Sequence, residues 1–231
     1  MKLSIIIPVF NEIKTIKTIV DKILNLKNLE IQIIIIDDYS TDGSREIIND
    51  ELTHKVDKII LHSKNLGKGA AIISAKNFIK GDIVIIQDAD LEYDPKDYYK
   101  LIEPILKGSS KVVYGSRVLD TNRYKDNNFT SNIRVFANHM LTLLSNLINN
   151  QNLTDAHTCY KVFESKLFKN IELVENGFSF CPEITTKISN LKIEITEVKI
   201  SYKGRSFEEG KKISLMDGFE AIKTLFKYKF L

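Results

Sequence analysis

Short apolar, β-branched runs alternate with longer amphipathic stretches along the first half of this chain. The runs are Leu3–Ile7, Ile33–Ile36, Lys58–Leu61, Ile83–Ile86 and Val112–Tyr114, and helical patterns lie between them near 13–28, 43–53, 68–80 and 95–107. Strands that are hydrophobic throughout are buried on both faces, as in a parallel sheet covered by helices. The pattern predicts an α/β fold with a Rossmann-like, mostly parallel sheet flanked by helices.

Polar segments follow each of these five runs. They read "PVFNE", "DDYSTDGS", "HSKNLGKG", "QDADLEYDP" and "GSR" in chain order. In open α/β sheets, ligands bind beyond the carboxyl ends of the strands. Because the five segments would meet at one edge of the sheet, the sequence predicts a binding site there.

The second half of the chain is less regular. Residues 131–150 carry a helical apolar stripe that we expect to pack in the core, consisting of Ile133, Phe136, Ala137, Met140, Leu141, Leu144, Leu147 and Ile148. An amphipathic strand is expected around 193–200 and a last helix from about 214. With no Pro/Gly/Ser-rich linker in view, we predict one catalytic domain over 1–212 and a C-terminal amphipathic helix over 213–231.

Composition excludes several classes of protein. The 231 residues carry a formal charge of +3, too small to indicate nucleic-acid binding. The two cysteines form neither a disulfide framework nor a metal-ligand spacing, which favours a reducing compartment. No segment approaches the ~20 apolar residues that span a bilayer, and the N-terminus reads as a strand rather than a signal peptide. A cytoplasmic location is expected.

The segment "QDADLEYDP" concentrates carboxylates directly after an apolar run. Asp88, Asp90 and Glu92 offer hard oxygen ligands, which suit Mg²⁺ or Mn²⁺ rather than zinc. Such ions also take phosphate oxygens of a substrate as ligands. The alternative is a solvated acidic turn without a ligand.

Other common site patterns are missing. "GKG" at 67–69 lacks the Gly-x4-Gly-Lys-Ser/Thr spacing of a phosphate loop, the four histidines have no metal spacing, and no covalent nucleophile motif occurs. A nucleotide site would therefore be built from scattered groups. The basic residues that could meet phosphates are Arg117, Arg205, Lys211 and Lys212. Taken singly, each of these is more often a solvated surface residue.

Taken together, "IIIPVFNE", "DDYSTDGS", "NLGKGAA", "QDADLEYDP" and "YGSR" resemble the family 2 glycosyltransferases with a GT-A fold. The closest resemblance is to dolichyl-phosphate mannose and glucose synthases and their bacterial polyprenyl-phosphate relatives. The later segments "TDAHTCYKVF", "GFSFCPEIT" and "YKGRSFEEGKKIS" also look like that branch. The resemblance thus covers nearly the whole chain.

The resemblance implies a set of site residues. Nucleotide-sugar binding falls to Pro8, Phe10, Glu12, Ile36, Asp38, Lys68, Asp88, Ala89, Asp90, Arg117, Arg205 and Lys211. The metal ligands would be Asp90 and Glu92, with Asp88 as a third, and the metal Mg²⁺ or Mn²⁺. This sequence also departs from the family's pattern, since Tyr39 replaces a usual Gly and Cys159 stands where Gly is frequent.

The mechanism depends on the acceptor. A polyprenyl phosphate is already an anion and needs no strong general base, so Asp88, Asp90 and Arg117 would act through positioning and charge. A glycan hydroxyl would need a carboxylate base, for which Glu183 in "CPEIT" is the candidate; its other role would be a charge at a helix N-terminus. Single displacement on an α-linked donor would invert the anomeric carbon.

The last helix could itself find a partner. Phe219, Ile222 and Phe226 share one face, and Lys223, Lys227 and Lys229 add positive charge. Such a helix suits an anionic membrane surface, where a lipid acceptor resides, or else packs on the domain or on another protein.

The sequence therefore predicts a metal-dependent glycosyltransferase that moves a sugar from a UDP- or GDP-sugar to a polyprenyl phosphate. Transfer to a glycan in surface-polysaccharide synthesis is the near alternative. Two other classes remain open: a nucleotidyltransferase, which would release pyrophosphate, and a non-catalytic nucleotide-sugar-binding protein.

Overall fold

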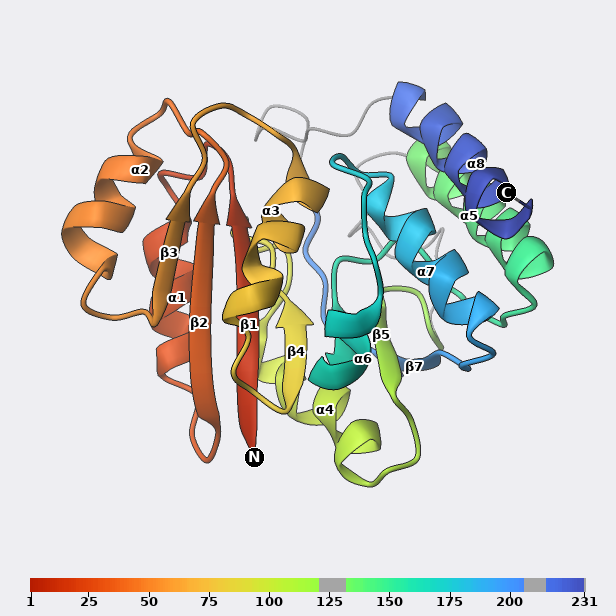
Figure 1. The fold of residues 1–231 in the computed structure, drawn as a ribbon, viewed down its shortest axis with the longest axis horizontal. Coiled ribbons are helices and arrows are strands. Elements are labelled where there is room, and N and C mark those ends of the chain that lie inside the picture. The colour runs from red at the N-terminus through yellow and green to blue at the C-terminus, as the bar shows by residue number, and fades with distance from the viewer. Residues whose placement is uncertain (121–131, 206–214, 231) are drawn as a thin grey trace.

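A seven-stranded sheet in the order β3-β2-β1-β4-β6-β5-β7 forms the centre of the protein (Figure 1). The computed structural model describes residues 1–120, 132–205 and 215–230. The strands are β1 (Lys2–Val9), β2 (Glu30–Asp37), β3 (Lys58–Leu61), β4 (Ile83–Ile86), β5 (Val112–Ser116), β6 (Lys161–Glu164) and β7 (Thr196–Lys199). All five strands predicted in the first half, and the strand expected near 193–200, are present.

The sheet is mostly parallel, as predicted. β1 runs parallel to β2 and β4, β2 to β3, and β5 to β7. β6 lies antiparallel between β4 and β5, so β4 and β5 point in the same direction. The carboxyl ends of the five predicted strands therefore share one edge, which is the edge where the polar segments begin.

Helices cover both faces of this sheet, which explains why its central strands are hydrophobic throughout. The first-half helices are α1 (Ile16–Leu24), α2 (Ser44–Ile47), α3 (Lys68–Ala75) and α4 (Tyr98–Leu106). A π-helical turn (Ile48–Leu52) extends α2, and 3₁₀ turns follow α3 (Lys76–Phe78) and precede α4 (Pro95–Asp97). Figure 1 shows α3 and the short α6 (Ser165–Asn170) on the near face, with α1 and α4 on the far face.

The second half adds a layer of three helices beside the sheet. They are α5 (Asn132–Asn149), α7 (Phe180–Asn190) and α8 (Leu215–Phe230), and α8 packs on both α7 and α5. The predicted domain boundary between 212 and 213 lies outside the described residues. Within the described ranges, no helix is both long and apolar enough to cross a membrane.

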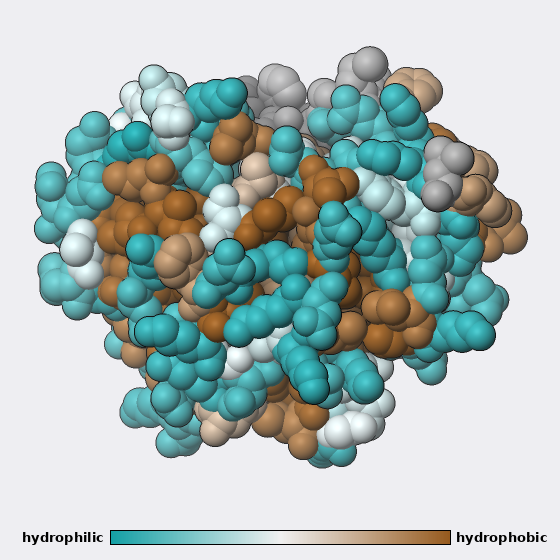
Figure 2. All heavy atoms as spheres, viewed as in Figure 1, coloured by the Kyte–Doolittle hydropathy of each residue, from teal (hydrophilic) through white to brown (hydrophobic). Residues whose placement is uncertain are grey.

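The predicted core stripe of α5 is wrong in part. Phe136, Met140 and Leu147 are 56%, 48% and 82% exposed, whereas the polar Thr142 and Asn149 are buried. The helix packs through polar contacts: Thr142 Oγ1 accepts a hydrogen bond from the Ala156 amide, and the Asn149 carbonyl accepts one from Ser189 Oγ. In the space-filling view, hydrophobic atoms reach the surface at the edge formed by α5 and α8 (Figure 2).

Candidate active site

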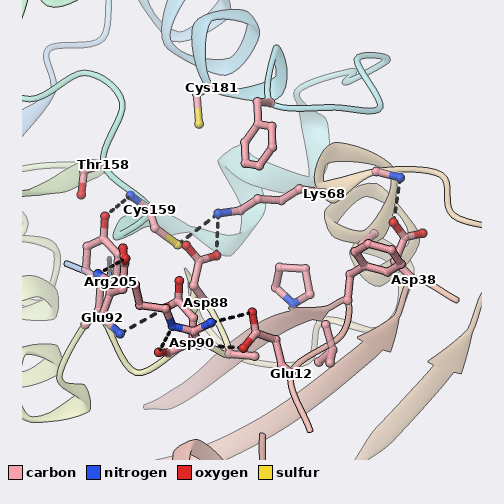
Figure 3. A pocket seen from close by; sticks show the side chains of 18 of the residues that line it. Glu12, Asp38, Lys68, Asp88, Asp90, Glu92, Thr158, Cys159, Cys181 and Arg205 are labelled. Carbon is pink, nitrogen blue, oxygen red and sulfur yellow. Dashed lines mark hydrogen bonds and ion pairs between the residues drawn. The ribbon is translucent and has the colours of Figure 1, made fainter. Parts of the chain in front are cut away.

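A cavity of about 400 Å³ opens at the carboxyl edge of the sheet, in the range of small-ligand sites. Eleven of the residues predicted for the site line it: Pro8, Phe10, Glu12, Asp38, Lys68, Asp88, Ala89, Asp90, Glu92, Arg117 and Arg205. Figure 3 shows seven of these side chains around the cavity, from the loops after β1, β2 and β4, from the start of α3 and from the segment before α8: Glu12, Asp38, Lys68, Asp88, Asp90, Glu92 and Arg205. Lys211 and Lys212 lie outside the described residues.

Asp38 organises one end of this cavity. Its carboxylate accepts hydrogen bonds from the amides of Leu66 and Gly67, at 2.8 and 2.7 Å, and lies 2.7 Å from Nδ1 of His62. These contacts fix the loop that leads into α3. The adjoining Tyr39 has a φ of 67°, the left-handed conformation in which Gly is usual, so this turn does tolerate a side chain.

Lys68, at the start of α3, reaches over the acidic segment. Its Nζ lies 2.5 Å from Oδ1 of Asp88 and 3.5 Å from Sγ of Cys159 (Figure 3). Burial opposes the charged form of Lys68, but the Asp88 carboxylate raises its pKa well above the usual value. The cavity therefore holds a fixed ammonium group beside the carboxylates, although "GKG" forms no phosphate loop.

The surroundings of Asp90 disfavour its charged form. Burial first, and then the charges of Asp88 and Glu92, raise the pKa of Asp90 to about 7. The Glu92 amide donates a hydrogen bond to its Oδ1 at 3.1 Å, which offsets only part of this effect. A partly buried carboxylate beside like charges is stabilised by a cation. The segment is therefore a structured turn beside a cavity and not a freely solvated acidic loop.

The third acidic residue has a different set of contacts. Glu92 accepts hydrogen bonds from Tyr202 Oη at 2.8 Å and from the Arg205 amide at 2.7 Å. These contacts hold the strand-like segment before α8 against the loop after β4. Glu92 therefore already shapes the cavity, whether or not it also contacts a metal.

The carboxylates fit a divalent cation that shares its coordination with a ligand. No three His, Cys, Asp or Glu side chains of the described residues are arranged as a complete metal site. Mg²⁺ commonly takes one or two protein carboxylates, with waters and substrate phosphates completing the octahedron. Asp90, whose pKa is raised by burial and then by the charges of Asp88 and Glu92, and the neighbouring Asp88 match that donor set.

Two arginines complete the electrostatics of the cavity. Arg205 donates to Glu12 Oε2 at 2.6 Å and to the Asp90 carbonyl at 2.9 Å. Arg117 binds Asp155 through Nε and Nη2 at 2.6 and 2.7 Å. Burial alone would raise the pKa of Asp155, but Arg117 holds it at about 2. Asp155 thus fixes the orientation of the Arg117 guanidinium at the cavity.

Two predicted residues do not reach the cavity. Ile36 is fully buried in β2. Glu183 is fully buried in the first turn of α7, where its carboxylate accepts hydrogen bonds from the amides of Val174 and Glu175 and pairs with Lys187 at 2.8 Å. Its side chain does not line the cavity. The geometry matches its other expected role, a charge at a helix N-terminus.

Glu183 nevertheless supports the cavity wall indirectly. The segment that it holds packs against the start of α3, where the Ala70 amide donates to the Asn176 carbonyl at 3.0 Å. The approach is so close that a Cβ on Gly69 would lie 2.0 Å from the Glu175 carbonyl oxygen. Lys68 directly precedes Gly69 in the chain. Glu183 thereby helps to position Lys68.

The cavity also contains residues to which the sequence assigned no role. They are Val9, Asn65, Gly67, Ala71, Tyr93, His157, Thr158, Cys159, Phe178, Cys181 and Tyr202. Several come from "TDAHTCYKVF" and "GFSFCPEIT", which the resemblance included without naming their function. The available signal was the placement of polar residues immediately before the short apolar run of β6.

Comparison with known proteins matches residues 4–172 to the family described as glycosyl transferase family 2. The chain belongs to this family. It is 28% identical to the UDP-N-acetylglucosamine–dolichyl-phosphate N-acetylglucosaminyltransferase of Methanococcus voltae, over 97% of this chain and 95% of that protein. It is also 28% identical to the dolichol-phosphate mannosyltransferase of Pyrococcus furiosus, over 99% of this chain and 62% of that protein. The predicted resemblance is confirmed.

Solved structures of glucosyl-3-phosphoglycerate synthase from Mycobacterium tuberculosis share the fold. The complex with Mn²⁺, UDP and phosphoglyceric acid has a TM-score of 0.72 at 19% identity, covering 100% of this chain and 79% of that one. The complex with Mg²⁺ and UDP has a TM-score of 0.70 at 19% identity, covering 99% and 79%. The likeness confirms the predicted GT-A fold for this family 2 glycosyltransferase.

Proposed function

We propose that this glycosyltransferase moves a sugar from a UDP- or GDP-sugar to a polyprenyl phosphate, with Mg²⁺ or Mn²⁺, and inverts the anomeric carbon. The observation that carries the proposal is the arrangement in the cavity: the crowded carboxylates of Asp88 and Asp90 stand among three cations, Lys68, Arg117 and Arg205. A diphosphate with a divalent cation would satisfy both sets of charges. The relatives named as dolichyl-phosphate transferases support the choice of acceptor.

Each group then has a role in the transfer. The nucleoside would lie toward Asp38 and Phe10, and the diphosphate beside Asp88, Ala89 and Asp90. A bound divalent cation supplies positive charge to the departing diphosphate. Lys68 and Arg205 neutralise phosphate oxygens, and Arg117, oriented by Asp155, stands at the acceptor side.

Most carboxylates on the cavity already have strong partners. Glu12 pairs with Arg205, Asp38 holds the loop before α3, Asp88 pairs with Lys68, and Glu92 holds Tyr202. Asp90, the remaining one, is the candidate metal ligand, and Glu183 does not line the cavity. A general base for a sugar hydroxyl is therefore not evident among the described residues. A phosphate acceptor, which is already an anion, suits this cavity better than a glycan hydroxyl.

A thermal-shift panel of UDP- and GDP-sugars with and without Mn²⁺ tests the donor site, because a ligand that binds the folded state raises its apparent stability. We expect one donor to raise Tm in a metal-dependent manner and Asp90→Ala to abolish that shift. A protein that no nucleotide sugar stabilises would contradict the proposal. Release of pyrophosphate would indicate a nucleotidyltransferase, and binding without turnover a non-catalytic protein. NMR of the product would show whether the anomeric configuration is inverted.

A further inference from the structure

A buried glutamine stands immediately before the carboxylates of the cavity. Gln87 follows β4, opens the segment "QDADLEYDP" and is 0% exposed. Its backbone N–H donates to the Ile6 carbonyl at 2.9 Å, which continues the pairing of β4 with β1 by one more residue. Its side chain does not line the cavity. Any effect of Gln87 on the site must therefore pass through its neighbours.

The side-chain amide of Gln87 has partners in three segments of the fold. Its Oε1 accepts hydrogen bonds from Tyr98 Oη at 2.6 Å and from Tyr160 Oη at 2.7 Å. Its Nε2 donates to the Asp88 carbonyl oxygen at 2.8 Å. Because a carbonyl oxygen can only accept, the nitrogen of the amide must face Asp88 and its oxygen must face the two hydroxyl groups. The orientation of the amide is thus determined.

Aromatic packing keeps the two hydroxyl groups in place. Tyr98, at the start of α4, and Tyr160, directly before β6, are fully buried, and their rings meet edge-on with centroids 5.8 Å apart. Tyr160 also packs on Tyr93, with centroids 4.7 Å apart, and the Tyr93 hydroxyl accepts a hydrogen bond from the Cys159 amide at 3.1 Å. A buried network whose members have partners favours a single arrangement of its side chains. Two separate elements therefore hold the Gln87 amide.

Stability alone does not explain a polar group at this position. Burying an amide is costly, and replacing a buried hydrogen-bonded set by apolar groups of the same shape is nearly neutral or even stabilising. Gln87→Met, together with Tyr98→Phe and Tyr160→Phe, would fill much the same space with apolar atoms. What such an apolar set would lack is the hydrogen bond to the Asp88 carbonyl. That contact is the property that requires a glutamine.

The Asp88 carbonyl belongs to the peptide group that joins Asp88 to Ala89, between the two candidate metal-binding carboxylates. A hydrogen bond to this oxygen restrains the peptide group, and with it the directions in which the side chains of Asp88 and Asp90 leave the backbone. The next residue, Leu91, has a φ of 63°, a left-handed conformation that is uncommon for leucine. Such backbone conformations persist only where the surroundings enforce them. The acidic turn therefore depends on outside contacts for its shape.

We propose that Gln87 is a positioning residue, which holds the turn from Asp88 to Asp90 in the geometry that binds the divalent cation. The inference rests on the proposed function, in which this cation accompanies the nucleotide sugar. Mg²⁺ requires a nearly ideal arrangement of its ligands, so a small rotation of this turn weakens its binding. Groups that orient metal ligands from outside typically change metal affinity by about 10- to 100-fold when they are removed.

The affinity for Mn²⁺ tests the inference. It would be measured with UDP or GDP, whichever raises Tm, from the electron paramagnetic resonance signal of the free ion, after subtraction of the Mn²⁺ bound in a protein-free sample. We expect Gln87→Met to weaken Mn²⁺ binding by roughly tenfold. It should also lower Tm, because two tyrosine hydroxyl groups lose their acceptor. Gln87→Met/Tyr98→Phe/Tyr160→Phe should regain most of that Tm and still bind Mn²⁺ as weakly as Gln87→Met.

Gln32→Met is the matched control. Gln32 is 1% exposed in β2, where its Oε1 accepts from Ser4 Oγ at 2.6 Å and its Nε2 donates to the Phe78 carbonyl at 2.9 Å. These contacts are of the same kind as those of Gln87, but they lie at the amino end of the strands, away from the cavity. Gln32→Met should lower Tm and leave Mn²⁺ affinity within about twofold of wild type.

Two results would overturn the inference and leave the proposed function intact. In one, Gln87→Met binds Mn²⁺ as tightly as wild type. In the other, the triple variant regains Mn²⁺ affinity together with Tm, which would show that Gln87 serves packing alone. A wild type that takes up no Mn²⁺ beyond the amount held by the free nucleotide would instead overturn the metal-dependent function, and this inference with it.

Discussion

Arg205 bridges to Glu12 across 193 positions of sequence, with Nη2 of the arginine 2.6 Å from Oε2 of the glutamate. The same guanidinium donates to the Asp90 carbonyl, so one side chain joins the loop after β1, the loop after β4 and the segment before α8. The cavity is therefore closed on this side by a contact between the loop after β1 and the segment before α8.

Arg205→Ala should weaken donor binding by about 10- to 100-fold, the range expected for the loss of one charge-assisted hydrogen bond to phosphate. Calorimetry with the nucleotide sugar and Mn²⁺ would measure the change. Lys203→Ala is the control, since it removes the same charge from an exposed neighbour. Equal affinity of the Arg205→Ala variant and wild type would show that Arg205 only holds the loops together.

Asp90→Asn should separate stability from function. Because the folded protein raises the pKa of Asp90 to about 7, ionisation of this carboxyl opposes folding. That cost is absent below about pH 4, the ordinary pKa of an aspartate, and grows until the pH passes 7. At pH 8 without metal, the variant should therefore melt at or above the temperature of wild type.

The same variant should lose its response to metal. Mn²⁺ should raise the Tm of wild type more at pH 8 than at pH 6, because the cation competes with the proton for Asp90. Asp90→Asn should show little of this effect, whereas Asp94→Asn, which alters a carboxylate off the cavity that caps the following turn, should keep it. A full metal response in Asp90→Asn would contradict the assignment of this residue as a ligand.

Glu183→Gln should lower the free energy of unfolding and leave the rate of sugar transfer nearly unchanged. The substitution places an amide group where two backbone N–H groups donate, and it removes the partner of Lys187. We expect a loss of about 2 kcal/mol or more in the free energy of unfolding, measured in urea. Turnover at saturating substrate should stay within a few-fold of wild type at a temperature where the variant is folded. An unchanged stability with a 10²-fold or greater loss of turnover would instead identify Glu183 as a general base.

The apolar edge formed by α5 and α8 should bind anionic vesicles. Phe219, Phe226 and Phe230 are 69%, 47% and 69% exposed, and Leu147 of α5 is 82% exposed. Such a surface, with the lysines of α8, suits the interface of a membrane that carries a polyprenyl phosphate. In co-sedimentation with vesicles containing phosphatidylserine, Phe219→Ser/Phe226→Ser/Phe230→Ser should bind several-fold less than wild type.

Leu106→Ser is the control for that experiment, because Leu106 is 54% exposed at the end of α4 on the far face of the sheet. It should bind vesicles like wild type. Unchanged vesicle binding by the triple variant would show that this edge does not bind the membrane. A protein partner would then be the alternative.

The parts of the site that follow strands were predictable from the sequence. The β-branched runs fixed the parallel strands, and the rule that ligands bind at their carboxyl ends placed Glu12, Asp38 and Asp90 together. β6 was missed because its short run, Lys161–Glu164, begins with a charged residue whose burial depends on carbonyl groups elsewhere in the fold.

The remaining differences between the sequence predictions and the structure come from side-chain partners that a sequence pattern does not show. A helical period identifies an apolar face but does not say whether that face is inside, and α5 turns Thr142 inward because the Ala156 amide provides a partner. The sequence offered Glu183 as a candidate base because it does not show that the amides of Val174 and Glu175, nine and eight residues earlier, donate to this carboxylate.

The most direct test of the account is transfer itself, measured as a lipid-linked sugar formed from a radiolabelled nucleotide sugar and a short-chain polyprenyl phosphate with Mn²⁺. The account predicts product with wild type, release of one nucleoside diphosphate per sugar transferred, and a loss of at least 10²-fold in Asp90→Asn, of the order found when one charge-stabilising group is removed from an active site. Wild type that binds the donor and transfers its sugar to a glycan, but never to the lipid phosphate, would contradict it.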